Sequence, residues 1–142
     1  MVIGANNSKV FIKDNSFDAN QTSKYHLAIE ISKQTFSYCI IDPKKHRCNL
    51  LYSKNYNTNN LLDLFKKDDF ITKNFSSKSI AVVNFPNTLV PKELYNEENK
   101  EKLFSLNHIP DEILLTDHLK NDIINIYSIP KIFYQTINNI IP

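Results

Sequence analysis

Apolar and polar residues alternate along the first part of the chain in a way that predicts three consecutive β-strands. The alternation covers 25–31, 35–42 and 47–56, and each segment contains β-branched or aromatic residues. Polar residues at 32–34 and a proline-containing segment at 43–45 separate these segments. Because both connections are short, we expect the strands to form an antiparallel meander.

Two helices and a buried strand are expected after the meander. Polar residues at 58–60 favour a helix N-terminus, and the apolar face of that helix consists of Leu61, Leu62, Leu64 and Phe65. The segment 79–85 (SIAVVNF) is almost continuously apolar, which is typical of a strand buried on both faces. Pro91 suits the first turn of a second helix extending to about Asn107, with these residues directed inward: Leu94, Tyr95, Leu103 and Phe104.

The last part of the chain predicts two strands and a helix. The strands cover 113–116 and 123–127, and the turn between them lies at 119–121. Pro130 begins the helix, whose apolar residues are spaced to pack on a sheet: Ile132, Phe133, Ile137 and Ile140. A meander followed by alternating helices and strands predicts an α/β fold.

Residues 1–24 are rich in Asn, Ser and Thr, and we expect them to form an irregular polar arm. A few apolar residues are expected to hold this arm against the body of the protein: Val10, Phe11, Ile12 and Phe17. Residues 25–142 then form the folded lobe. The sequence stops at Pro142 without a polar tail, which favours the N-terminal half of a longer, two-lobed protein.

Composition narrows the class of protein. The length of 142 residues fits one domain or one lobe, and 42% hydrophobic with 23% charged residues allows a buried core. A net charge of +2 argues against nucleic-acid or membrane binding over the whole surface. There is no apolar run of about 18 residues, and 1–5 lack the basic start and apolar core of a signal peptide, so we expect a cytoplasmic location.

Three stretches of sequence resemble a known family: FDANQTSKYHLAIEIS (17–32), TFSYCII (35–41) and NTLVPKELYNEENKEKLFSLNH (87–108). They are similar to a bacterial family of unknown function with an actin-like ATPase fold. The resemblance implies a ribonuclease H-like lobe of that fold, in which a three-strand meander is followed by alternating helices and strands. Members of the family are roughly twice as long as this chain, as two lobes of this type. The family has no established activity, so the resemblance implies a fold only.

Active actin-like ATPases place an Asp and a Gly on the first strand and its hairpin turn, where backbone N–H groups bind phosphate. Here Glu30 occupies the acidic position, while Ser32, Lys33 and Gln34 fill the turn, and Gly4 is the only glycine. Added side chains crowd a phosphate and disfavour positive φ. We therefore expect no cofactor. Mg·ATP is the alternative, with candidate binding residues Glu30, Ser32, Lys33 and Thr35.

Catalytic and metal chemistry have little support in the sequence. A ribonuclease H-like nuclease needs several carboxylates around two Mg²⁺ ions, but only Glu30 and Asp117 lie near candidate strands, and 79–85 contains no carboxylate. The histidines lack the spacing of a zinc site: His26, His46, His108 and His118. We predict no catalytic residue and no metal site.

Cys39 and Cys48 are the only cysteines, and a reducing cytoplasm would keep both as thiols. A hairpin turning at Pro43–Lys44 places them directly opposite each other, whereas a four-residue loop separates them. A catalytic pair of Cys39 with His26 is a further alternative, although a cysteine within an apolar strand is usually structural.

The densest basic cluster is Lys44–Lys45–His46–Arg47, at the tip of the second predicted hairpin. The aromatic residues of the adjoining strands would be needed to stack nucleic-acid bases: Phe36, Tyr38 and Tyr52. Lysines at an exposed turn are ordinarily solvated, and strand aromatics ordinarily pack on the sheet. We therefore predict that the chain does not bind nucleic acid.

Two hypotheses remain. In the first, the chain is a non-catalytic interaction or scaffold protein on a degenerate actin-like fold, with an unknown protein partner or self-association. In the second, it is an ATP-binding actin-like protein whose phosphate loops lie mostly in a missing C-terminal lobe. The helix at 131–141 is the candidate interaction face, and we expect the isolated chain to dimerise or aggregate more than the full-length protein.

Overall fold

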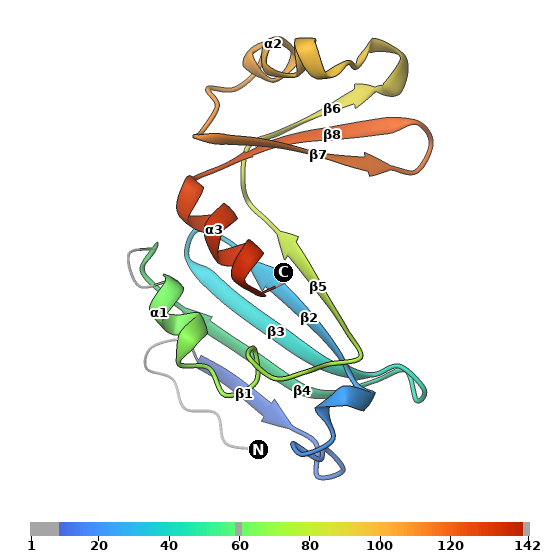
Figure 1. The fold of residues 1–142 in the computed structure, drawn as a ribbon, viewed down its shortest axis with the longest axis vertical. Helices are drawn as coiled ribbons and strands as arrows, with labels where there is room; N and C mark the ends of the chain where they lie inside the picture. Colours follow the sequence, from blue (N-terminus) through green and yellow to red (C-terminus); the bar gives the residue numbers. More distant parts are fainter. Residues whose placement is uncertain (1–8, 59–60, 141–142) are drawn as a thin grey trace. The chain divides into compact units, whose positions relative to one another are not determined.

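The computed structural model describes residues 9–58 and 61–140, which are drawn as a coloured ribbon in Figure 1. The chain divides into two compact units, and each is described by itself. The first unit comprises residues 1–83 with 136–142, and the second comprises residues 84–135.

The first unit is built on a five-stranded sheet in the order β1-β4-β3-β2-β5 (Figure 1). Its strands are β1 Lys9–Lys13, β2 His26–Ile31, β3 Thr35–Asp42, β4 Arg47–Asn55 and β5 Ser77–Val82. Strands β2, β3 and β4 pair antiparallel in sequence order, which confirms the predicted meander. Strand β5 runs parallel to β2 on the opposite side from β3.

One face of this sheet carries the core of the first unit. Strand periodicity places the buried side chains of β2 and β3 on that face: Leu27, Ile29, Ile31, Phe36, Tyr38 and Ile40. Helix α1, Leu61–Lys66, covers it, and the rings of Phe65 and Phe36 lie 4.6 Å apart. The helix begins where the sequence predicted it, although residues 59–60 of the expected cap lie outside the described residues.

Strand β1 corrects the prediction of an irregular arm over the first 24 residues, because Lys9–Lys13 pair antiparallel with β4. Val10, Phe11 and Ile12 do not bury themselves against the body, since they are 44%, 51% and 60% exposed. Phe17 does reach the core, and its ring lies 5.5 Å from that of Tyr25. A five-residue strand with both faces exposed lacks the alternation by which strands are recognised in sequence.

Strand β5 corrects a second prediction. It begins at Ser77, two residues before the expected start, and none of its residues is fully buried. In the described part of the chain it is an edge strand, with β2 on one side only. Ile80 and Val82 are therefore half-buried, although the apolar run predicted a strand covered on both faces.

The second unit contains a three-stranded antiparallel sheet in the order β6-β8-β7. Its strands are β6 Asn87–Pro91, β7 Ile113–Leu119 and β8 Ile123–Ile129, and helix α2, Lys100–Ser105, packs along β6 and β8. The core of this unit is formed by Val90, Phe104, Ile124 and Ile126, with Tyr95, Leu103 and Leu114 packed around it. The β7–β8 turn uses left-handed backbone at Asn121 and Asp122, with φ of 62° and 55°.

The long helix predicted from Pro91 to about Asn107 is wrong in its first half. Pro91 ends β6, and two 3-10 turns, at Lys92–Leu94 and Glu97–Asn99, precede the short α2. Leu94 is 62% exposed instead of facing inward, whereas Phe104 is buried as predicted. Asn side chains that bond to nearby backbone compete with a continuous helix, and Asn96 does so here by accepting the N–H of Asn99 at 2.7 Å.

Helix α3, Lys131–Ile140, follows Pro130 as predicted. Its residues Phe133, Thr136 and Ile140 are buried at 1%, 0% and 5% exposure. Ile140 is therefore not part of an exposed apolar face, although it belongs to the helix that was expected to provide the interaction face. Residue 141 of that expected helix lies outside the described residues.

Candidate functional site: the β2–β3 turn and the hollow beside Tyr52

The turn between β2 and β3 is held together by the side chain of its first residue. The Ser32 hydroxyl oxygen accepts the backbone N–H of Gln34 at 3.2 Å and that of Thr35 at 2.9 Å. The N–H of Ser32 donates in turn to the carbonyl oxygen of Thr35 at 2.9 Å. Ser32 is only 6% exposed, so these bonds are shielded from water.

This bonding decides how the turn would meet a phosphate. A phosphate site needs several unpaired backbone N–H groups that converge on one point. In this turn the N–H groups of Gln34 and Thr35 converge on Ser32 Oγ, which takes the place of an anion. Among the described residues, none in this turn has positive φ. The turn therefore does not need the left-handed backbone that favours glycine.

The carbonyl side of the turn is also bonded. The Tyr56 N–H donates to the carbonyl of Gln34 at 2.9 Å, and the Tyr56 hydroxyl donates to the carbonyl of Ser32. The Thr58 hydroxyl donates to the carbonyl of Lys33 at 3.3 Å. Burial raises the pKa of the Tyr56 hydroxyl, which keeps it a donor at neutral pH. The turn is therefore fixed from both sides.

The structure brings together only some of the candidate nucleotide-binding residues. Ser32 and Thr35 are in direct contact, and the backbone of Lys33 lies between them. Glu30 is an exposed residue of β2, with Ser37 and Ala81 as its register partners on the neighbouring strands. The turn thus joins Ser32 and Thr35 through bonds that occupy the donors a phosphate would use.

The structure also shows where the groups considered for nuclease and Cys–His catalysis lie. Asp117 lies on β7 in the second unit, whereas Glu30 lies in the first. The His26 ring nitrogens bond to the hydroxyls of Ser77 at 2.8 Å and Ser79 at 2.9 Å, not to Cys39. Within residues 9–58 and 61–140 there is no group of three or more His, Cys, Asp or Glu side chains that could hold a metal.

Cys39 and Cys48 form a disulfide, which corrects the expectation of separate thiols. The loop is the four-residue one, and the register partners are Leu51 for Cys39 and Ile41 for Cys48. The two cysteines nevertheless lie on the same face, because Ile41, the partner of Cys48, is two residues from Cys39 along β3. Their Cα atoms are 6.4 Å apart.

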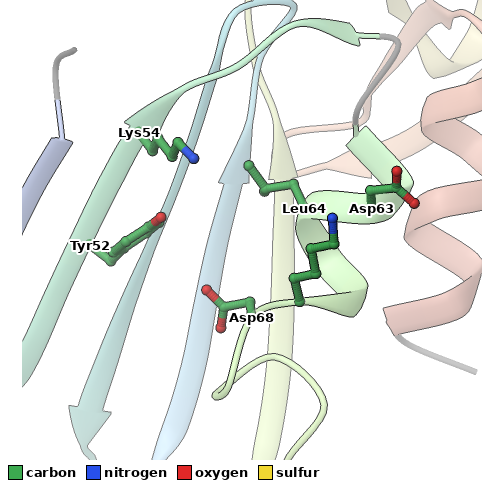
Figure 2. Close-up of a pocket in the computed structure, with 6 residues that line it drawn as sticks. Tyr52, Lys54, Asp63, Leu64 and Asp68 are labelled. Atoms are coloured by element: carbon green, nitrogen blue, oxygen red, sulfur yellow. The ribbon is translucent and has the colours of Figure 1, made fainter.

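A hollow of about 380 Å³ lies between β4 and helix α1 (Figure 2). It is lined by Tyr52, Lys54, Asp63, Leu64, Lys67 and Asp68. Figure 2 shows the Lys54 side chain, the Tyr52 hydroxyl and the Asp68 carboxylate directed into the space between the strand and the helix. The lining therefore combines two cations and two carboxylates with an aromatic ring.

The tyrosines at and behind this hollow are hydrogen-bond donors. Burial, and then the Asp68 carboxylate, raises the pKa of both Tyr38 and Tyr52, so both hydroxyls stay protonated and act as donors at neutral pH. A nucleophile or general base needs a pKa that is shifted toward the working pH, and these tyrosines are shifted away from it. The lining suits a ligand with both charges, such as a polar peptide segment.

We did not identify Asp63 and Asp68 from sequence, because acidic residues on a surface helix are ordinarily solvated.

Two of the aromatic residues considered for nucleic-acid binding are buried. Tyr38 is 3% exposed and Phe36 is fully buried, so neither can stack a base. At the hairpin tip, Arg47 pairs with Asp14, and the backbone N–H groups of Lys44 and Lys45 donate to Asp42 Oδ1. The side chains of these two lysines are exposed.

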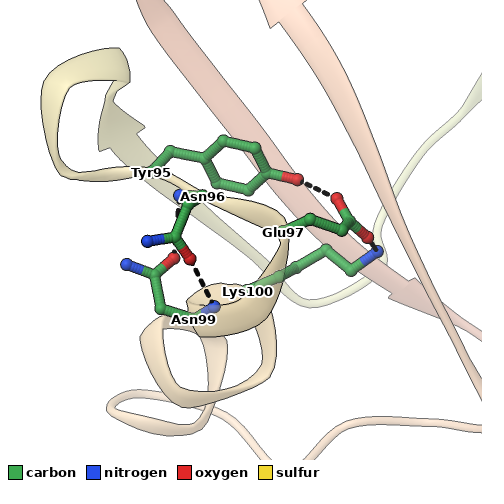
Figure 3. Close-up of polar contacts among 5 residues, drawn as sticks. All are labelled: Tyr95, Asn96, Glu97, Asn99 and Lys100. Atoms are coloured by element: carbon green, nitrogen blue, oxygen red, sulfur yellow. Dashed lines mark hydrogen bonds and ion pairs between the residues drawn. The ribbon is translucent and has the colours of Figure 1, made fainter.

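A second hollow, of about 370 Å³, lies in the second unit and is mainly acidic. Its lining consists of Glu97, Glu98, Lys100, Glu101, Pro110, Asp111, Glu112 and Leu114. Figure 3 shows Glu97 between the Tyr95 hydroxyl and the Lys100 amino group, both of which bond to it. These bonds, that of Lys100 first, lower the pKa of Glu97. The carboxylate of Glu97 is thus used within the protein.

Comparison with known proteins supports the fold. The model of a family described as "Protein of unknown function (DUF3822)" matches residues 14–142. A crystal structure from Bacteroides thetaiotaomicron, described as a protein with actin-like ATPase fold and unknown function, matches with a TM-score of 0.78 and 29% identity. The match covers 90% of this chain and 53% of the other, so this chain spans about half of the length of that protein. No curated protein matches.

These matches confirm the predicted actin-like fold and the resemblance to a family of unknown function. In the described ranges, no helix is both long enough and apolar enough to cross a membrane.

Proposed function

This chain belongs to a family of proteins of unknown function, DUF3822, and we propose that it is a non-catalytic interaction or scaffold protein on an actin-like fold. One observation carries the proposal: the Ser32 hydroxyl accepts the turn N–H groups of Gln34 and Thr35. Releasing them for a phosphate would break two hydrogen bonds in a poorly exposed site, so nucleotide binding at this turn is disfavoured.

The surface that remains suits the binding of a protein. The hollow beside Tyr52 offers hydrogen-bond donors and charges of both signs without an activated nucleophile. Exposed apolar residues on β1 and β4 lie on neighbouring strands of the same sheet. We propose another protein as the partner, with self-association as the alternative. A cytoplasmic location remains part of the proposal, and the Cys39–Cys48 disulfide, which a reducing cytoplasm would open, counts against it.

Thermal unfolding with increasing Mg·ATP tests this function. A ligand that binds the folded state raises the unfolding temperature in a saturable manner. We expect no saturable shift in this chain or in the full-length protein. A shift with sub-millimolar affinity in the full-length protein would contradict the nucleotide-free scaffold. Ser32→Gly is the matched variant, because it removes the internal acceptor and leaves the N–H groups of Gln34 and Thr35 unpaired.

The second candidate function is ATP binding by a longer protein. One observation favours it: the similar solved structure is described as having an actin-like ATPase fold, and this chain spans about half of it. In this alternative, Mg·ATP is held by phosphate loops that lie mostly outside the 142 residues. Mg·ATP binding by the full-length protein that is unaffected by Ser32→Ala and Thr35→Ala would support it.

A further inference from the structure

Strand β1 is an edge strand whose outer backbone groups are available. Within the described residues it pairs with β4 alone. The Asp14 N–H donates to the Asn49 carbonyl at 2.9 Å, which fixes the phase of hydrogen bonding along this antiparallel pair. Hydrogen-bonded and non-bonded pairs alternate, so the backbone groups of Lys9, Phe11 and Lys13 point away from β4.

The side chains of β1 give this edge a defined pattern. Lys9, Phe11 and Lys13 share one face of the sheet with their register partners on β4, among them Tyr52. Val10 and Ile12 lie on the other face. All three apolar residues are at least 44% exposed. A complementary strand would therefore meet apolar residues at its three central positions and lysines at both ends.

The lysines of this edge are not neutralised. Lys9 lies directly opposite Lys54, and like charges in such a cross-strand pair are destabilising. The Lys9 and Lys13 amino groups lie 5.5 Å and 5.6 Å from the ring centres of Tyr52 and Phe17. In the described part of the chain, none of the three lysines forms an ion pair. A carboxylate from a partner strand would relieve this repulsion.

We propose that β1 binds an extended segment of another protein by strand addition, and that the segment has acidic residues at both ends of an apolar centre. The proposal rests on the proposed interaction function and names the class of partner. Terminal lysines on an edge strand oppose unselective pairing. In an antiparallel second copy of β1, Lys9 would lie opposite Lys13, so self-pairing is disfavoured and an acidic partner is selected.

The family match does not cover this strand, because the match begins at residue 14, after β1. The hollow beside Tyr52 lies on the same side of the sheet as Phe11, because these two residues are register partners. Side chains of a bound strand that extend past Phe11 would reach the rim of the hollow formed by Lys54.

Peptide binding tests the proposal directly. The probes are fluorescein-labelled peptides with the core Glu-Val-Phe-Val-Glu or Lys-Val-Phe-Val-Lys, and binding is measured by fluorescence anisotropy. We expect the acidic peptide to bind about tenfold more tightly at low salt, and the preference to shrink as salt rises. Equal binding of the two peptides, or no binding of the acidic one, would overturn the proposal.

Two variants and a modified peptide separate charge from backbone recognition. The double variant Lys9→Glu with Lys13→Glu should reverse the preference, whereas Lys44→Glu with Lys45→Glu makes the same charge change at the hairpin tip and should preserve it. N-methylation of the peptide amides that face β1 should abolish binding. Retention of binding by the N-methylated peptide would exclude strand addition.

The outcomes also distinguish this inference from the proposed function. If the acidic peptide does not bind and Mg·ATP has no effect, the β1 proposal alone is contradicted. Saturable binding of Mg·ATP would instead contradict the scaffold function. Circular dichroism of the variants establishes that β1 substitutions leave the sheet folded. If Lys9→Glu with Lys13→Glu unfolds the protein, the N-methylated peptide still decides the question with the unmodified chain.

Discussion

Tyr38 and Tyr52 are directly opposite each other on β3 and β4, and their rings stack with centroids 4.9 Å apart and planes at 22°. The pair places two hydroxyl groups beside the carboxylate of Asp68. Because burial and this carboxylate both disfavour the phenolate, the two tyrosines couple the stability of the first unit to alkaline pH.

The first prediction concerns that pH dependence. The pKa of Tyr38 is raised in the folded state, so its stabilising contribution is complete below the unfolded pKa of about 10 and is lost as the pH rises further. We expect the urea midpoint to fall above about pH 10, and Tyr38→Phe to make the fall shallower. The exposed Tyr134 supplies the control, since Tyr134→Phe should leave the slope unchanged. An equal slope in wild type and Tyr38→Phe would contradict the coupling.

The second prediction concerns Ser32. Ser32→Ala removes the acceptor of two backbone N–H groups in a site of low exposure, so we expect a loss of about 1–3 kcal/mol in the free energy of unfolding. Urea unfolding measures the loss. Ser105→Ala, at an exposed position of α2, is the control and should change the free energy by less than about 0.5 kcal/mol. A similar small effect for Ser32→Ala would mean that its hydroxyl does not hold the turn.

The third prediction concerns the core of the second unit. Phe104 is fully buried among Val90, Ile124 and Ile126, so Phe104→Ala should cost about 3–5 kcal/mol. Amide hydrogen exchange at β8 is the measurement, and protection there should fall. Leu106→Ala, at a side chain that is 78% exposed, should leave exchange unchanged. Unchanged protection of β8 in Phe104→Ala would refute this packing.

The fourth prediction concerns the 3-10 turn Glu97–Asn99, which precedes α2. The Asn96 and Asn99 side chains each accept the other's backbone N–H, at 2.7 and 2.9 Å (Figure 3). Asn96→Ala should cost about 0.5–2 kcal/mol by removing one of these acceptors. Hydrogen exchange of the Asn99 N–H should rise. Asn107→Ala, beyond the end of α2 and exposed, serves as the control.

Sequence patterns identified the elements whose alternation is long and one-sided. Strands β2 and β3 were found because apolar residues recur at every second position from Leu27 to Ile31 and from Phe36 to Ile40. Helix α3 was found because Pro130 precedes it. The pattern failed where local side-chain bonds decide the backbone. Asn96 interrupts the predicted helix, and five exposed residues form β1 only because β4 offers an edge.

The sequence located the β2–β3 turn as the candidate site, but it did not predict the hydrogen bonds within that turn. The absence of glycine drew attention to the β2–β3 turn, yet the turn does not adopt positive φ among the described residues. What occupies its donors is the Ser32 hydroxyl, and the direction of a serine side chain depends on the folded backbone. The lining of the hollow beside Tyr52 joins residues from β4 and from 63–68, which no local pattern brings together.

The single extra residue at Asn49 has a consequence for the evolution of the β3–β4 hairpin. Ile40 lies opposite Leu50 and the next residue of β3, Ile41, lies opposite Cys48, so Asn49 has no partner of its own in the register. Side chains beyond Asn49 therefore follow the opposite odd–even parity from those before it. A deletion of Asn49 would leave Cys48 opposite Ile41 and Leu50 opposite Ile40, because these pairs then follow each other without a bulge. The hairpin can thus lose this residue and still keep Cys48 on the face of Cys39.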